Sequence, residues 1–199
     1  MQTLRLARVA FFAMQGKWTR LRSALEEAAA ASTSRAVEEC LLQLVLFAGF
    51  PTGIEAFRVW TRVRRGASTT PESGGDRASW ARSGQRLCKR VYGGKFEPLR
   101  RVMRHSSPEL DSLMLEWGYG RVLSRPGLSA ARREALTFAG LLGVNRPRQL
   151  RAHIEGCLNL GVGASEMKAI LAELGPHAGA RRARAARTLL DLTLAERKG

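Results

Sequence analysis

The sequence predicts an all-α fold, and three observations support this prediction. Apolar residues recur at helical spacing, as in the stripe formed by Val37, Cys40, Leu41, Leu44 and Val45. Glycine, proline and serine residues stand where such stripes begin and end, as helix boundaries require. No stretch shows the sustained alternation of apolar and polar residues that marks a half-buried strand.

The helices are expected in the following order. The first half predicts helices over residues 4–15, 18–30, 34–47 and, after the break AGFPTG, 51–60. Residues 66–76, GASTTPESGGD, are rich in Gly, Ser, Thr and Pro and predict a flexible linker. The second half predicts helices over residues 77–91, 96–103, 108–122, 130–142 and 148–160.

An internal repeat appears when the sequence is compared with itself, because residues 3–62 and 131–191 follow the same order of helices. At an offset of 130, the residues Leu41, Leu44, Ala48, Gly49 and Ala56 fall on Leu171, Leu174, Ala178, Gly179 and Ala186. We therefore expect a duplicated helical unit with a helical insert between the copies. The predicted parts are a first, degenerate repeat over 3–65, a linker with insert helices over 66–105, and a second repeat over 106–195.

Composition narrows the class of protein. With 199 residues, 45% hydrophobic and 25% charged, the chain is long enough for a real core. The three cysteines are far apart and show no CxxC or Cys/His ligand spacing, so neither a disulfide framework nor a metal site is expected. No apolar segment approaches the length of a membrane span, and the N-terminal apolar run is short for a signal core. These features predict a cytoplasmic protein without a membrane partner.

The formal net charge is +16 and comes mainly from arginine. Basic residues are spread along the chain, without aromatic interleaving or a nucleic-acid recognition motif. A nucleic-acid partner is therefore not expected. A non-catalytic binding or scaffold protein with a basic surface stays open as an alternative.

Residues 130–160 bring together the chemistry-bearing side chains. Ser129 is the expected N-cap of the helix over 130–142, and Pro147 is expected to start the next helix after a short break. An antiparallel hairpin of these helices places Glu134 beside His153, and a carboxylate beside an imidazole fixes the tautomer of the ring for proton transfer. Cys157 follows His153 by four residues on the same helical face. A structural Glu–His pair and a buried, inert Cys157 are the alternative interpretations.

The segments YGRVLSRPGLSAARREALTFAGLL, RQLRAHIEGCLNLGVGASEM and EECLLQLVLFAGFPTGIEAF resemble the carboxymuconolactone decarboxylase family, in a two-repeat form. This family belongs to the alkylhydroperoxidase D-like superfamily. The resemblance implies an all-helical, cofactor-free homo-oligomer, a trimer or hexamer, with sites near subunit interfaces. It also implies that Glu134 and His153 match the glutamate and histidine of the superfamily. The two cysteines of the peroxidase branch correspond to Arg146 and Gln149 here, so dithiol peroxidase chemistry is not expected.

For the decarboxylase branch, the resemblance implies acid–base chemistry on a small lactone or carboxylate metabolite, with catalytic Glu134 and His153. Loss of carbon dioxide requires a proton donor for the developing carbanion and cationic anchors for carboxylates. The candidate substrate-binding residues are Tyr119, Arg121, Arg125, Arg146 and Asn159. Trp80, Cys88, Tyr92 and Trp117 are expected either to line a pocket or to lie in the core. Hydroperoxide reduction with Cys157 as a lone thiol is the alternative activity.

Overall fold

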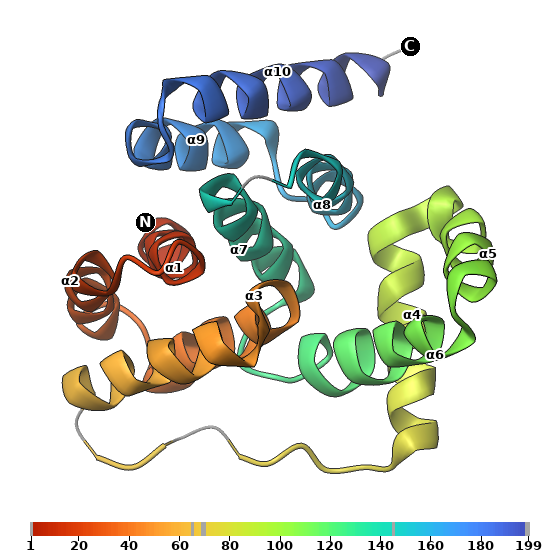
Figure 1. Ribbon diagram of the computed structural model, residues 1–199, viewed down its shortest axis with the longest axis horizontal. Coiled ribbons are helices and arrows are strands. Elements are labelled where there is room, and N and C mark those ends of the chain that lie inside the picture. Colours follow the sequence, from red (N-terminus) through yellow and green to blue (C-terminus); the bar gives the residue numbers. More distant parts are fainter. Residues whose placement is uncertain (1, 65, 69–70, 145, 198–199) are drawn as a thin grey trace.

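All regular elements in the described part of the chain are helices, which confirms the predicted all-α class. The computed structural model describes residues 2–64, 66–68, 71–144 and 146–197. Its elements are α1 (Gln2–Met14), α2 (Trp18–Ala29), α3 (Ser34–Val63), α4 (Arg77–Tyr92), the short 3-10 helix η1 (Gly93–Lys95), α5 (Phe96–Ser106), α6 (Pro108–Ser112), the π-helix η2 (Leu113–Leu123), α7 (Ala130–Gly143), α8 (Pro147–Asn159), α9 (Ala164–Ala178) and α10 (Ala180–Glu196). Figure 1 shows α7 in the middle of the molecule, with α1 and α2 to one side and α4 to α6 to the other.

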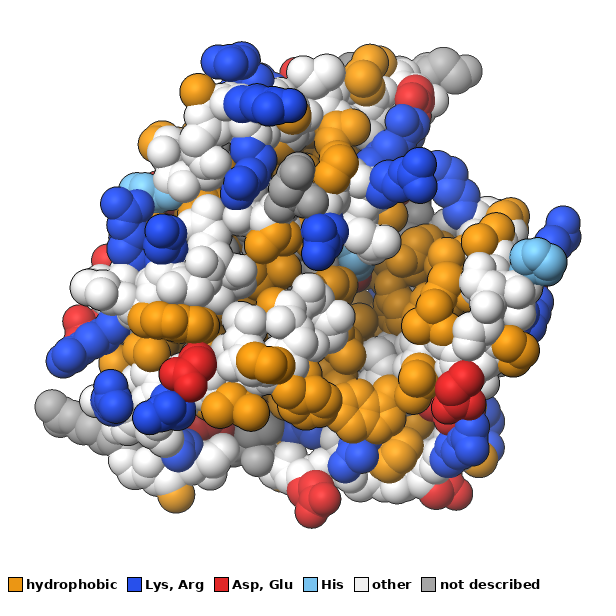
Figure 2. Space-filling model, in the orientation of Figure 1, with side chains coloured by type: hydrophobic (Ala, Val, Ile, Leu, Met, Phe, Trp, Pro, Cys, Tyr) orange, Lys and Arg blue, Asp and Glu red, His pale blue; other side chains and the backbone are white. Residues whose placement is uncertain are grey.

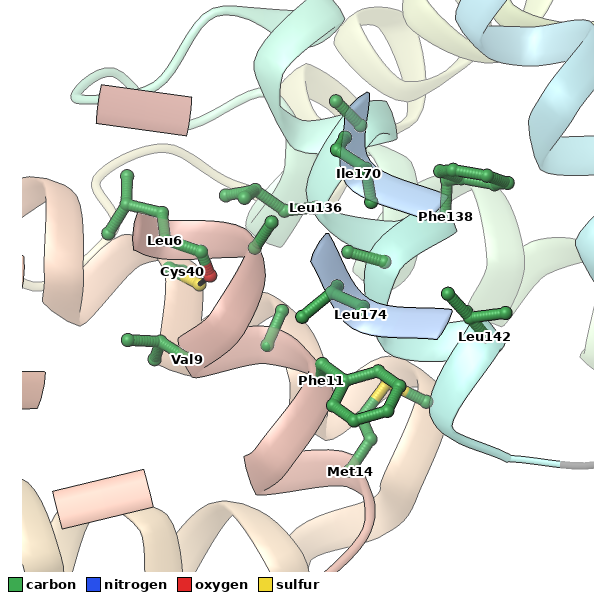
Figure 3. Packing of buried hydrophobic residues seen from close by; sticks show 14 of the residues in the cluster. Leu6, Val9, Phe11, Met14, Cys40, Leu136, Phe138, Leu142, Ile170 and Leu174 are labelled. Atoms are coloured by element: carbon green, nitrogen blue, oxygen red, sulfur yellow. Dashed lines mark hydrogen bonds between the residues drawn. The ribbon is translucent and has the colours of Figure 1, made fainter. Parts of the chain in front are cut away.

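The main hydrophobic core lies where α1, α7 and α9 meet. α1 buries Leu6, Val9 and Phe11 completely, although it stands where the sequence has a weak resemblance to a signal core. These side chains pack against Phe138 of α7 and Leu174 of α9 (Figure 3). The core fixes the direction of α7, the helix that carries Glu134.

Helix α3 spans 30 residues but is bent at Gly49. The bend divides it into two helical segments. Gly49 has φ 78° and ψ 168°, a backbone conformation that side chains other than glycine rarely adopt, and Pro51 follows it. By length and composition alone, α3 is apolar enough to cross a membrane, which corrects the expectation that no such segment exists. The bend, however, divides it, and the first segment contributes Leu41 and Leu44 to the core.

A second, smaller hydrophobic cluster joins α4 to η2. The two backbones are in direct contact where the helices cross, and only glycine fits there. A Cβ atom on Gly84 would overlap the carbonyl oxygen of Leu115, and one on Gly120 would overlap that of Trp80. The sequence predicted one helix over 108–122, whereas the structure has the short α6 followed by a π-helix. This wider helix presents Gly120 to α4 and thereby closes one side of the functional site.

The predicted flexible linker is held in place over its second part. Arg125 donates from Nη2 to the carbonyl oxygen of Pro71 at 2.6 Å and also from Nη1 to Ser73. The indole of Trp80 donates to the carbonyl oxygen of Gly74 at 2.9 Å. Residues 71–76 are therefore attached to the loop after η2 and to α4 by side-chain hydrogen bonds that composition alone does not reveal.

Candidate functional site

The α7–α8 hairpin positions the central pair of residues as the sequence predicted. The hydroxyl of Ser129 accepts a hydrogen bond from the backbone of Arg132 at 3.2 Å and caps α7. Pro147 is the first residue of α8, where its missing N–H leaves no intrahelical bond unmade. Glu134 and His153 thereby face each other from two antiparallel helices.

The two side chains form a short hydrogen bond in a buried position. The distance between His153 Nδ1 and Glu134 Oε2 is 2.7 Å, and each residue is 2% exposed. The Phe47 ring packs edge-to-face on the imidazole, with the ring centroids 5.2 Å apart. When Nδ1–H donates to the carboxylate, Nε2 is the ring nitrogen left to act on a bound molecule.

His153 also lines a cavity of about 520 Å³ that opens to solvent between α3, α5, η2 and α8. Its other lining residues are Val45, Leu46, Phe47, Phe50, Tyr92, Leu99, Met103, Leu110, Leu113, Met114, Trp117, Gly118, Tyr119, Leu123 and Gln149. Figure 2 shows hydrophobic side chains gathered around a hollow in the right half of this face. The cavity is within the range of about 300–1,000 Å³ that suits small-molecule ligands.

Tyr92 and Tyr119, the two tyrosines of the chain, both line the cavity. Their ring centroids are 6.1 Å apart. Burial raises the pKa of Tyr92 to about 12, and burial followed by the charges of Tyr92 and Glu134 raises the pKa of Tyr119 well above its usual range. Both phenols are therefore neutral hydrogen-bonding groups at physiological pH. Tyr119, Tyr92 and Trp117 line the cavity as the sequence allowed, whereas Trp80 and Cys88 lie outside its wall.

The three arginines predicted as carboxylate anchors do not line this cavity. Arg121 stacks on Trp80 and Trp117, with its guanidinium carbon 4.7 Å and 5.5 Å from the ring centroids. Arg146 is exposed and precedes α8, outside the wall. Both cations therefore lie outside the wall of this cavity, and their role as carboxylate anchors stays a prediction.

Arg125 is used in the interior of the protein. Its Nε lies 3.0 Å and 3.1 Å from the two carboxylate oxygens of Glu39, and Arg133 Nη2 donates to the same carboxylate at 2.8 Å. Glu39 is fully buried, and a buried carboxylate is costly unless it is paired. The guanidinium groups of Arg125 and Arg133 provide that pairing. Arg125 thus joins α3, the 71–76 segment and α7 and lies outside the wall of this cavity, while its binding of substrate stays a prediction.

Asn159 also has a structural position. Its Nδ2 donates to the carbonyl oxygen of Val91 at 2.7 Å, and its Oδ1 accepts from Arg197 at 2.7 Å. These bonds join the end of α8 to α4 and to the C-terminal helix. The amide has these two partners and lies outside the cavity wall, and its contact with substrate stays a prediction.

Cys157 has the surroundings of an inert thiol. It is completely buried and does not line the cavity. Burial, followed by the negative charge of Glu134, raises the pKa of Cys157 well above its usual range. Because the thiolate is the nucleophilic form, this environment opposes the predicted alternative of a lone-thiol peroxidase.

Two further features of the site are its lack of a metal-binding group among the described residues and the lining residues Phe47 and Gln149. Within the described ranges, no three His, Cys, Asp or Glu side chains gather as a metal-binding group. Phe47 and Gln149, which flank His153 in the cavity, were not proposed as site residues. The break AGFPTG carries a signal for Phe47, since it predicts the bend of α3 that brings this ring to the cavity.

The fold and site together define an all-helical protein with a buried carboxylate–imidazole pair at an apolar cavity. Residues 108–192, from α6 into α10, match the carboxymuconolactone decarboxylase family. This segment, which contains both Glu134 and His153, is where the chain is similar to the family.

Comparison with curated proteins gives three relatives. 4-Carboxymuconolactone decarboxylase of Acinetobacter baylyi is 34% identical over 71 residues, which cover 36% of this chain and 53% of that protein. Nitrosuccinic acid decarboxylase npaB of Metarhizium robertsii is 30% identical over 88 residues, covering 43% and 60%. Peroxisomal protein 2 of Schizosaccharomyces pombe is 27% identical over 135 residues, covering 63% and 60%. The matches thus span between about half and three fifths of these relatives.

Proposed function

We propose that this protein is a carboxy-lyase-type enzyme in which His153, oriented by Glu134, protonates the carbon that loses carbon dioxide. The observation that carries the proposal is the 2.7 Å contact between Nδ1 and Oε2 at the wall of an open cavity. Two relatives whose names contain decarboxylase support the reaction class.

The proposed reaction begins with a substrate whose carboxylate is attached to a carbon next to an electron-withdrawing group, such as the carbonyl of a lactone. The C–CO₂ bond breaks, and its electron pair stays on that carbon and spreads into the neighbouring group. The imidazolium of His153 then transfers its Nε2 proton to the carbon, and solvent restores the proton after product release. The Glu134 carboxylate offsets the free-energy cost of an imidazolium in this buried position.

The apolar wall assists the same step. A carboxylate in a cavity of low polarity loses hydration, whereas the carbon dioxide that it releases is neutral. Tyr92 and Tyr119 supply neutral donors for the oxygen that gains charge.

The test is a screen of lactone acids and other carboxylates in which released carbon dioxide is measured for the wild type and three variants. We expect His153→Ala to lower turnover by about 10²- to 10⁴-fold, and Glu134→Gln to lower it by about 10- to 100-fold. His105→Ala is the matched control, because His105 is exposed and outside the cavity wall. Equal turnover of the His153→Ala variant and the wild type would overturn the proposal.

A further inference from the structure

The composition of the cavity wall limits what it can bind. Among the described lining residues, most are aliphatic, aromatic or methionine side chains, and none is Arg, Lys, Asp or Glu. Proteins hold carboxylates with paired guanidinium or ammonium groups, and a carboxylate without such a partner is expensive to remove from water. Of the groups on this wall, the His153 imidazole is the one that can carry a positive charge.

The cavity is also polar at one end and apolar at the other. Tyr119 and His153 line the cavity and are only 5% and 2% exposed, and the Tyr92 ring lies 6.1 Å from that of Tyr119, so these polar groups lie at its inner end. At the mouth, by contrast, Phe50, Leu110 and Leu113 are 60%, 46% and 49% exposed. A ligand that suits both ends has one polar group directed inward and an apolar body directed outward.

We infer that the cavity takes a largely apolar molecule with a single carboxylate, which enters carboxylate first, and that it discriminates against small dicarboxylates. This inference rests on the proposed function, because it names the substrate class of the same site. Its physical basis is that the cavity wall offers a second carboxylate, at the far end of the ligand, no cation to pair with and only the apolar side chains of Phe50, Leu110 and Leu113. An aryl or alkyl group at that end instead buries its surface against these side chains.

Binding is measured with the neutral fluorophore N-phenyl-1-naphthylamine and with two competitors that share a six-carbon acid chain. The competitor 6-phenylhexanoate ends in a phenyl ring, and adipate ends in a second carboxylate. We expect the fluorophore to bind and 6-phenylhexanoate to displace it at a concentration at least about tenfold lower than adipate does. Failure of the fluorophore to bind to the folded protein, or equal displacement by adipate, would overturn the inference.

Two variants of matched exposure locate the binding. Leu113→Arg places a cation at the mouth, where the second carboxylate of adipate would lie. Leu192→Arg makes the same change at a residue that is 51% exposed on α10, outside the cavity wall. We expect Leu113→Arg to weaken fluorophore and 6-phenylhexanoate binding by about tenfold while strengthening adipate binding, and Leu192→Arg to change each less than about twofold. An unchanged preference in Leu113→Arg would also overturn the inference, since a merely structural role of Leu113 does not reverse selectivity.

The same binding assay separates this inference from the proposed function, because it needs no turnover. If His153→Ala binds the fluorophore and 6-phenylhexanoate, and wild-type decarboxylation does not depend on His153, the proposed function fails and the inference stands. If turnover depends on His153 but adipate is preferred to 6-phenylhexanoate, the inference fails and the proposed function stands.

Discussion

Cys157 lies one helical turn after His153 on α8, but the surroundings of the two side chains differ. The imidazole has a carboxylate partner and faces the cavity, whereas the thiol is fully buried among apolar side chains. The spacing of four residues predicts that His153 and Cys157 lie on the same face of the helix, but it does not predict which of them reaches the cavity. Access to the cavity depends on what α9 and the rest of the core cover.

We predict that Cys157 is unreactive in the folded protein. All three cysteines are buried, and burial raises the pKa of Cys157 well above its usual range, so little thiolate is available to a thiol reagent. Reaction with 5,5′-dithiobis(2-nitrobenzoate) at pH 8 should be at least about 100-fold slower in buffer than in guanidinium chloride. A fast-reacting thiol in native protein that Cys157→Ala removes would contradict this prediction and revive the thiol mechanism.

The residues of the central pair were predictable because short-range signals fix them. Ser129 marks the start of α7, and Pro147 marks the start of α8 after a short turn. The position of each side chain along its helix follows from the helical rise. The position of Arg125 was not predictable in this way. Its partner Glu39 is 86 residues away, and arginines with and without such partners look alike in a sequence this rich in arginine.

At the scale of elements, the helix order and the two bends agree with the predicted repeat. Gly49 has φ 78° and ψ 168°, and Gly179, 130 residues later, has φ 89° and ψ 144°. Gly49 ends the first segment of α3, the third helix of the first half, and Gly179 follows α9, the third helix counted from α7. We propose that these helices are two copies of one unit. The duplication and the boundaries at 3–65, 66–105 and 106–195 stay predictions.

The distribution of the wall residues along the chain explains why the cavity could not be predicted as a whole. Its wall combines the bend of α3, the helices α5 and η2, and one face of α8, which are far apart in the sequence. Local patterns predicted most helices to within a few residues, but not the π-helical form of η2 or the glycine contact with α4. Those features depend on contacts between elements, which no single stretch of sequence encodes.

One ion pair joins two elements of this wall, and we predict that it makes stability depend on acid. Arg100 of α5 donates to both carboxylate oxygens of Asp111 in α6, with Nη2 2.6 Å from Oδ2. The hydrogen bonds from Arg100 hold the pKa of Asp111 below its usual range. The contribution to stability is therefore complete above the unfolded pKa of about 4 and is lost as pH falls through the lower, folded value.

Asp111→Asn should lower the free energy of unfolding by about 2 kcal/mol at pH 7, since it removes a charge-assisted pair. The difference from the wild type should begin to shrink below about pH 4 and vanish as pH falls through the lower, folded pKa of Asp111. Urea denaturation at both pH values measures this. Glu109→Gln, at an exposed neighbouring position, is the control. A difference that is the same at pH 7 and pH 3 would show that packing, not charge, accounts for the effect.

At the scale of the whole molecule, the excess of positive charge takes no part in the proposed site but affects the stability of the fold. The chain has 33 Lys and Arg against 17 Asp and Glu. Exposed pairs such as Arg22–Glu26 and Arg58–Glu55 contribute little, about 0–1 kcal/mol each. Net repulsion among the remaining cations therefore outweighs the attraction that salt would screen.

We predict that added salt stabilises this protein. Between about 20 and 300 mM sodium chloride, screening of the net repulsion should raise Tm by about 2–5 °C. The first half of α10 adds to the repulsion, because Arg181, Arg184 and Arg187 are exposed at spacings of three and no acidic residue stands in the first turn.

The matched variant replaces Arg181, Arg184 and Arg187 with Gln and leaves Arg182, which donates to the carbonyl oxygen of Gly143, in place. Its Tm at low salt should be higher than that of the wild type, and its rise with salt should be smaller, because fewer like charges remain to be screened. Differential scanning fluorimetry across the salt series measures both quantities. A wild-type Tm that falls as salt is added would mean that specific ion pairs, such as those of Glu39 with Arg125 and Arg133, outweigh the net charge even under screening.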